Sequence, residues 1–264
     1  MTASLYVASR SGGDTNGQWA PVGRLDRTNG QYQFRYTRGA ETLENFSPFA
    51  GMPDLHEVYT SDELLPLFAN RLLARSRPEY EAHLRWCGFA ASTLPDSLAL
   101  LSVTEGRRAT DAVEVFACPE PDADGRYVST FFAHGLRCLP QSAKDRIDRL
   151  QAGDPLYVVH DASNAHDADA MTLIAAAVDA AIKVGFVPRY LASDIRMLTA
   201  RAGGNVPRVT VARVNGDAPL QYRLLCRVQM EWPAGFRPCA GKGFEPVNGT
   251  ISPTSQNVFE SIPS

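Results

Sequence analysis

The stretch that decides the fold lies in the second half of the chain. It consists of FFAHGLRCLP (131–140), GDPLYVVHDASNAHDADAMTL (153–173) and VGFVPRYLA (184–192). Apolar runs rich in β-branched residues alternate here with one loop that is dense in Asp, Asn and His, and the last run contains a Gly-led turn. This pattern predicts strands arranged around a single polar loop.

The segments around this stretch predict further strands and two helices. Strands are expected at YVSTFFAHGLR (127–137), LYVVH (156–160), RVTVARVN (208–215) and YRLLCRVQMEW (222–232). The run MTLIAAAVDAAIKVGFV (171–187) indicates a strand, a turn and another strand, although its alanines leave a helix open. Helices are expected at 142–154, with Ser142 as a cap and Gly153 as a stop, and at 191–203.

The first half of the chain mixes strands and helices. Strands are expected at SLYVAS (4–9), WAPVGRL (19–25), QYQFRYT (31–37) and ATDAVEVFACPE (109–120). The Asn29-Gly30 pair between two such runs is a strong hairpin signal. Residues 38–58 show no regular pattern. Helices are expected at LLPLFANRLLARS (64–76), after the capping residues 61–63, and at 78–89 and 96–104.

The stretch PEPDADGR (119–126) is the best candidate for a domain boundary, because it is rich in Pro, Asp and Gly. We therefore expect an α+β protein with an N-terminal α+β module at 1–120 and a second domain at 127–235. From Cys239 onward periodicity is lost, which predicts a loosely docked or flexible tail over 239–264.

Composition limits the classes of function. The 264 residues carry a net charge of −3, which argues against non-specific coating of nucleic acid. Residues 1–125 have 11 arginines and 17 acidic residues, whereas residues 126–235 have 11 arginines and two lysines against ten acidic residues. This asymmetry suggests two domains with different partners, although a chance fluctuation explains it equally well.

The start of the chain and the cysteine spacing indicate the compartment and exclude some kinds of site. The start of the chain lacks a basic region followed by an apolar one, and no apolar run could span a membrane, so we expect a cytoplasmic protein. The five cysteines are widely spaced and contain no CxxC, so neither a disulfide framework nor a zinc site is expected.

Residues 129–232 resemble the HIRAN domain, the small barrel that grasps DNA ends in some SNF2-type helicases. The resemblance rests on LYVVHDASNAHDADAMTL (156–173) and KVGFVPRYLA (183–192). It implies an OB-like barrel of about six strands with two flanking helices. Such a barrel binds single strands in a basic groove with aromatic platforms.

The resemblance also implies a set of DNA-binding residues. Asp167 matches the carboxylate that accepts a hydrogen bond from a terminal 3′-hydroxyl. Arg137 and Arg189 match basic residues beside the strand, and His166 matches an aromatic that stacks on a base. Cys138 occupies a position where end-binding members carry an aromatic residue.

Other family positions also differ, and simpler explanations exist. Ala165 replaces a usual Pro, and Phe186 replaces a frequent His. Asn164 and Asp167 are also ordinary turn formers, and both arginines could be solvated surface charges. Phe131, Phe132 and Phe186 are expected to fill the core.

Residues 5–117 are similar to the N-terminal subdomain of HipA-type Ser/Thr kinase toxins. The similarity is carried by PVGRLDRTNGQYQFRYT (21–37), by SDELLPLFANRLL (61–73) with Phe68, Asn70, Leu72 and Leu73, and by RRATDAVEVF (107–116). The resemblance implies a module that contacts kinase or antitoxin partners. Leu64, Leu65, Leu67 and Phe68 are expected to be core rather than interface. The kinase body is absent from the sequence.

No catalytic motif of a hydrolase, a metalloprotease, a P-loop protein or a Rossmann fold is present. The dipeptides His160-Asp161 and His166-Asp167 could suggest a metal-dependent phosphohydrolase, but no further ligand set supports it. We therefore expect a non-catalytic protein without cofactor or metal that binds single-stranded DNA or a 3′ end and docks a protein partner. The alternative is an interaction partner of a HipA-like kinase in a toxin–antitoxin system.

Overall fold

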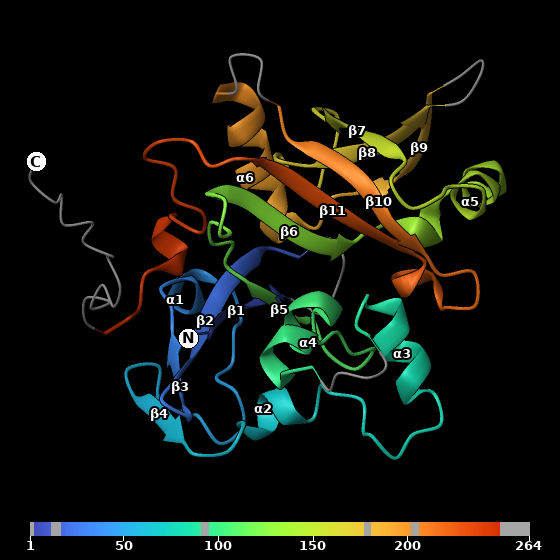
Figure 1. The fold of residues 1–264 in the computed structure, drawn as a ribbon. Helices are drawn as coiled ribbons and strands as arrows, with labels where there is room; N and C mark the ends of the chain where they lie inside the picture. Colours follow the sequence, from blue (N-terminus) through green and yellow to red (C-terminus); the bar gives the residue numbers. More distant parts are fainter. Residues whose placement is uncertain (1–2, 12–16, 91–94, 177–180, 202–205, 249–264) are drawn as a thin grey trace, which may run out of the picture.

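The structure is a computed structural model and describes residues 3–11, 17–90, 95–176, 181–201 and 206–248. Two antiparallel sheets with helices packed against them make up the described chain, so the predicted α+β class is confirmed. Figure 1 shows the first sheet at the lower left and the second above it, with helices α3 and α4 at the lower right.

The first sheet has five strands in the order β4-β3-β2-β1-β5. Its strands are β1 (Ala3–Arg10), β2 (Trp19–Thr28), β3 (Gln31–Tyr36), β4 (Val58–Ser61) and β5 (Val113–Ala117). The predicted hairpin at Asn29-Gly30 is confirmed, since Thr28 pairs directly with Gln31. β4 was not expected, because residues 38–58 lack a period-two pattern. It is a short edge strand that pairs only with β3.

The helices of the first half are α1 (Gly39–Thr42), α2 (Pro66–Ala69), α3 (Tyr80–Trp86) and α4 (Ser97–Thr104). The helix predicted over 64–76 is wrong, because only the single turn α2 forms. The leucines of this stretch serve two clusters instead of one helix face. Leu64, Leu65 and Leu67 pack with buried Phe68 against the first sheet, whereas Leu73 packs beside α3 and α4.

The second sheet has six strands in the order β6-β11-β10-β7-β8-β9. Its strands are β6 (Arg126–Phe132), β7 (Pro155–His160), β8 (Met171–Ala176), β9 (Ala181–Phe186), β10 (Arg208–Val214) and β11 (Leu224–Glu231). Met171–Ala176 and Ala181–Phe186 thus form the two predicted strands rather than a helix, while the predicted turn between them lies outside the described residues. One isolated antiparallel bridge, His134 to Phe186, joins the chain just after β6 to the end of β9.

Two helices lie beside the second sheet, α5 (Gln141–Asp148) and α6 (Arg189–Arg201). Ser142 was predicted to cap α5, but the cap position is Pro140, because proline sets the extended backbone that enters the first turn. Ala143 and Ile147 of α5 and Leu191, Ile195 and Leu198 of α6 belong to the same buried cluster. Three short 3-10 turns complete the described elements: η2 (Leu136–Cys138), η3 (Leu220–Tyr222) and η4 (Lys242–Phe244).

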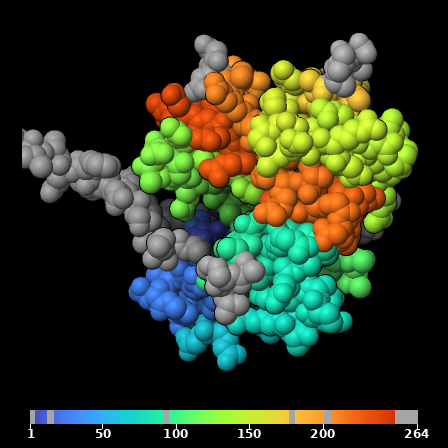
Figure 2. All heavy atoms as spheres, turned by 45° about the vertical axis from the view of Figure 1, so that its right-hand side comes forward, coloured from blue at the N-terminus to red at the C-terminus, as the bar shows by residue number. Residues whose placement is uncertain are grey.

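The two halves share their buried interior through β1. Leu5 and Val7 point into the core of the first sheet, whereas Tyr6 and Ala8 join the core of the second sheet. The alternation of a strand thereby places one strand between two cores. In Figure 2 the teal surface around α3 meets the orange surface near η3, where Trp86 Nε1 donates to Asp217 at 3.0 Å.

After β11 the chain first packs against the core of the second sheet through Trp232, buried Phe236 and Cys239, and residues 245–247 then bond to the chain at the end of β3. The N–H of Arg38 donates to the carbonyl of Glu245 at 2.8 Å, and the N–H of Val247 donates to the carbonyl of Tyr36 at 3.1 Å. The remainder of the predicted tail, residues 249–264, lies outside the described residues. No described helix is long and apolar enough to cross a membrane.

Asp194 of α6 generates a prediction about stability. Its side chain is buried, its Oδ2 has no hydrogen-bond partner among the described residues, and burial raises its pKa to about 7 despite a bond from the Cys239 N–H. The folded protein therefore holds a proton that the unfolded chain releases between its usual pKa of about 3.9 and pH 7. Stability must fall as the pH rises through this window, by on the order of 4 kcal/mol in total.

We expect Asp194→Asn to flatten this decline. Urea unfolding measured between pH 5 and pH 8 should show a smaller loss of unfolding free energy than in the unmodified protein. Asp145→Asn, at an exposed position on α5, is the matched control and should leave the decline unchanged. Equal pH slopes for Asp194→Asn and the unmodified protein would contradict the prediction.

Candidate nucleic-acid interface

The loop between β7 and β8 is held by its own Asx side chains. Asn164 Oδ1 accepts hydrogen bonds from the N–H groups of His166 and Asp167, at 3.0 and 3.1 Å. Asp167 Oδ1 accepts from the N–H of Asp169 at 3.0 Å, and the N–H of Asp161 closes the loop on the carbonyl of Ala170 at 2.8 Å. The turn-forming explanation therefore holds for Asn164 and for one oxygen of Asp167.

The other oxygen of Asp167 faces Arg189. Oδ2 lies 3.7 Å from Arg189 Nε, and both side chains are partly exposed. Arg189 is the first residue of α6, and its guanidinium lies 5.8 Å from the centre of the Trp19 ring. The structure thus brings together two of the predicted site residues and adds an indole from β2 that the sequence did not indicate.

The remaining predicted residues have exposed side chains that do not bond to this pair. Arg137 and Cys138 are exposed on η2, and His166 is exposed on the loop. Within the described residues, no side-chain hydrogen bond or ion pair joins Arg137, Cys138 or His166 to Asp167 or Arg189. The structure therefore leaves the side chains of these three residues at the surface and does not show a role for them in the pair.

Two close approaches fix the chain beside η2. Gly135 has a φ of +77°, and a Cβ there would lie 2.9 Å from Phe186 Cδ2. Gly185 has a φ of +148°, and a Cβ there would lie 3.0 Å from the carbonyl oxygen of His134. Glycine is therefore favoured at both positions beside the bridge between His134 and Phe186.

Phe186 itself was predicted to fill the core, as Phe131 and Phe132 do. Instead it is only half-buried, because it lies on the outward face of β9. Lys183 Nζ sits 3.7 Å from the centre of its ring, a cation–π contact at the surface.

A buried acid that the sequence did not reveal links the two halves next to this site. Glu105, at the end of α4, has a φ of +60° and is 2% exposed. Both its carboxylate oxygens lie 2.8 Å from His134 Nε2, and Tyr190 Oη donates to Oε1 at 2.9 Å. A left-handed non-glycine residue is strained by about 1–3 kcal/mol, so the carboxylate must be held firmly by its partners.

The electrostatics of Glu105 follow from these contacts. Burial alone would raise its pKa, but the charges of His134 and Arg107 and the bonds from His134 and Tyr190 outweigh burial and keep the pKa below its usual range. His134 Nε2 must carry a hydrogen to donate to the carboxylate. The pKa of Tyr190 is raised well above its usual value by burial and by the same carboxylate. Tyr190 therefore stays protonated and remains a donor.

Glu105 with its partners His134, Tyr190 and Arg107 is called the Glu105 cluster. Glu114 of β5 connects this cluster to the Asp167–Arg189 pair. Trp19 Nε1 donates to Glu114 at 3.2 Å, while Arg107 and Arg10 approach the same carboxylate at 3.8 and 3.9 Å. Burial lowers the pKa of Arg10, and the nearby charges of Arg189 and Arg107 lower it further. The site is therefore built from both halves of the chain.

This arrangement of charges suits positioning and binding better than nucleophilic chemistry. Arginines and carboxylates alternate from Glu105 to Asp167, and the carboxylates of Glu105 and Glu114 are buried. Only the outer end, at Asp167 and Arg189, offers a partly exposed acceptor and a donor group side by side. Such a pair can accept a hydroxyl hydrogen and contact a phosphate oxygen at the same time.

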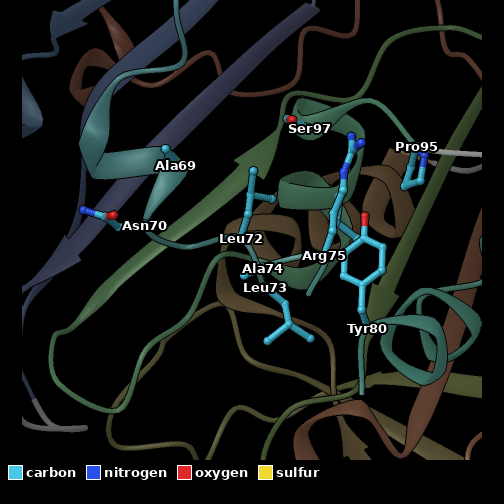
Figure 3. A pocket seen from close by; sticks show the side chains of 10 residues that line it. Ala69, Asn70, Leu72, Leu73, Ala74, Arg75, Tyr80, Pro95 and Ser97 are labelled. Carbon is cyan, nitrogen blue, oxygen red and sulfur yellow. The ribbon is translucent and has the colours of Figure 1, made fainter. Parts of the chain in front are cut away.

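Two cavities of the described chain lie away from the predicted site residues, none of which lines them. The larger cavity, about 410 Å³, lies in the first half between α2, α3 and α4. Figure 3 shows Leu72, Leu73, Arg75 and Tyr80 around it. The smaller one, about 140 Å³, lies beside η2 and α5 and is lined by Lys144, Asp148 and Arg223 among others.

The two His-Asp dipeptides do not converge on one point. His160 Nε2 contacts the carbonyl of Ala168 at 2.8 Å, and Asp161 accepts from Ser163 Oγ at 2.7 Å. Among the residues that the structure describes, no group of three or more His, Cys, Asp or Glu side chains could hold a metal ion.

Comparison of the chain with models of protein families, with curated proteins and with solved structures finds no match. The resemblances to the HIRAN domain and to the HipA subdomain therefore remain predictions from the residues quoted above, and the function must be argued from the site itself.

Proposed function

We propose that the protein binds single-stranded DNA at a 3′ end, through the surface around Asp167 and Arg189. The observation that carries the proposal is that the two carboxylate oxygens of Asp167 have different partners. Oδ1 is held by the loop, and Oδ2 faces Arg189 at 3.7 Å without a closer partner among the described residues. A carboxylate fixed in this way is oriented before a ligand arrives.

The chemistry of a 3′ end fits this pair. A 3′-hydroxyl can donate its hydrogen to Asp167 Oδ2, because an ionised carboxylate accepts and does not donate. Arg189 lies beside it to contact the last phosphodiester, and its guanidinium presents a fork of N–H donors suited to phosphate oxygens. A 3′-phosphate would bring two negative charges together and would be rejected.

We further propose that the second sheet is an OB-like barrel of the HIRAN type. The His134–Phe186 bridge supports this, because it joins the ends of the first and last strands in the sheet order. The two helices α5 and α6, packed against the same core, also fit the proposal. In this view the protein is non-catalytic, and the Glu105 cluster positions α6 and the His134 turn.

A 3′-end reader should discriminate between chemically different ends. We expect a short oligothymidine with a 3′-hydroxyl to bind at least about tenfold more tightly than one with a 3′-phosphate, a difference of about 1.4 kcal/mol. Asp167→Asn keeps an Oδ1 acceptor for the loop but removes the charge, so the discrimination should be lost. Fluorescence anisotropy with both oligonucleotides measures this.

The control is Asp169→Asn in the same loop, whose carboxylate is paired with Arg196 at 2.7 Å. This variant should retain the discrimination. Equal binding of both ends by the unmodified protein would exclude end reading. Binding of neither oligonucleotide would exclude the proposed function, and would turn attention to the alternative partner, a HipA-like kinase, tested by nuclease-resistant co-purification.

We expect the positive charge of Arg189 to raise the affinity for single-stranded DNA through one phosphate contact. Arg189→Gln should weaken binding to any sequence and reduce the slope of log K against log salt by about 0.7, the contribution of one phosphate contact on a single strand. Arg196→Gln, on the next turns of α6, is the control and should leave the slope unchanged. A salt titration from 50 to 300 mM distinguishes the two, and an unchanged slope for Arg189→Gln would contradict the assignment.

A further inference from the structure

The outward face of the second sheet exposes apolar side chains beside the proposed end site. Along β7 the residues alternate, so that Leu156 is buried in the core while Tyr157 and Val159 are 60% and 48% exposed. Tyr157 pairs with Ile174 of β8, and Ile174 pairs with Lys183 of β9. These side chains therefore form one row across three strands on the outer face.

Cations stand on both sides of Tyr157 in this row. Val209 pairs with Leu156 and Thr210 with Pro155, and continuing this antiparallel register places Arg208 of β10 across from Tyr157 on the outer face. Arg227 of β11 lies on the same face, opposite Thr210. Arg208 and Arg227 are exposed and form no ion pair or side-chain hydrogen bond with a described residue.

Two strands of this face lead toward the end site. β7 and β9 both run antiparallel to β8, so the C-terminal ends of both strands lie at the same end of the sheet. β7 leads directly into the loop that carries Asp167, and β9 ends at Phe186, three residues before Arg189. Lys183, at the β9 end of the row, contacts the Phe186 ring at 3.7 Å and lies 3.9 Å from Asp161 at the start of the loop that carries Asp167.

We propose that this outer face binds the single strand upstream of its 3′ end, with Tyr157 stacking on a base and Lys183, Arg208 and Arg227 contacting phosphates. The proposal rests on the proposed function and extends it to a binding track. Exposed aromatic side chains flanked by cations are the usual combination for single strands, since bases offer π-faces and the backbone offers charge. A second copy of the chain fits less well, because a twofold contact here would bring the same cations together.

Oligonucleotide length separates the track from the end site. We expect Tyr157→Ala to weaken binding of a 15-nucleotide oligothymidine about tenfold, within the range of one lost base stack. A trinucleotide bound only at its 3′ end should be much less affected, and Tyr157→Phe should restore binding of the longer strand. The combined variant Arg208→Ala and Lys183→Ala should reduce the salt slope for the longer strand only.

Val58→Ala and Arg149→Ala are matched controls at exposed positions away from this face, and should change neither affinity nor slope. Unchanged binding of the longer strand by Tyr157→Ala, with 3′-end discrimination intact in the same variant, would overturn the track and leave the proposed function standing. If the unmodified protein self-associates in sedimentation and Tyr157→Ala abolishes this without changing DNA affinity, the track is overturned, and the face instead binds a second copy of the chain. Failure of the unmodified protein to bind either length would remove both proposals.

Discussion

The burial of one carboxylate, that of Glu105, constrains much of this structure. Removing a carboxylate from water costs several kcal/mol, and the cost is offset only when charge and hydrogen bonds replace the lost hydration. His134 and Tyr190 supply those bonds from the second half of the chain, and Arg107 supplies charge from the first. Loss of a single partner would leave the acid uncompensated, which typically destabilises a protein by about 3–5 kcal/mol. The two halves are therefore held in one relative placement by a contact that tolerates little adjustment.

This contact reaches the proposed site through the chain itself. His134 pairs its backbone with Phe186, and Tyr190 directly follows Arg189. The ring of Tyr190 also stacks on Phe116 of β5, with centroids 4.5 Å apart. The start of α6 is thus fixed against the first sheet, so the first half is a structural part of the site. Its acidic composition suggested a separate domain with its own partners, yet Trp19 and Arg10 come from that half and border the Asp167–Arg189 pair.

The strands were predictable because period-two alternation and the Asn29-Gly30 turn are local signals. The helix predicted over 64–76 failed because its leucines serve two different clusters, and which cluster a leucine joins is decided by tertiary packing. Asp167 and Arg189 were predicted and lie together. Glu105 was missed, since a glutamate before a glycine at a helix end resembles an ordinary C-terminal cap. Nothing local in the sequence shows that its partners come from residues 134 and 190.

The spacing of the Asp167–Arg189 pair explains why such a site can stay open. A direct ion pair with N–O distances near 2.8 Å would satisfy both groups and would have to be broken by a ligand. At 3.7 Å the two groups neutralise each other's field but keep hydrogen-bonding capacity. This separation persists only if neither side chain can relax toward the other. Asp167 is fixed by the N–H of Asp169, and Arg189 by the helix that Tyr190 anchors to Glu105. The buried Glu105 carboxylate is thus linked through Tyr190 to the helix start that carries Arg189.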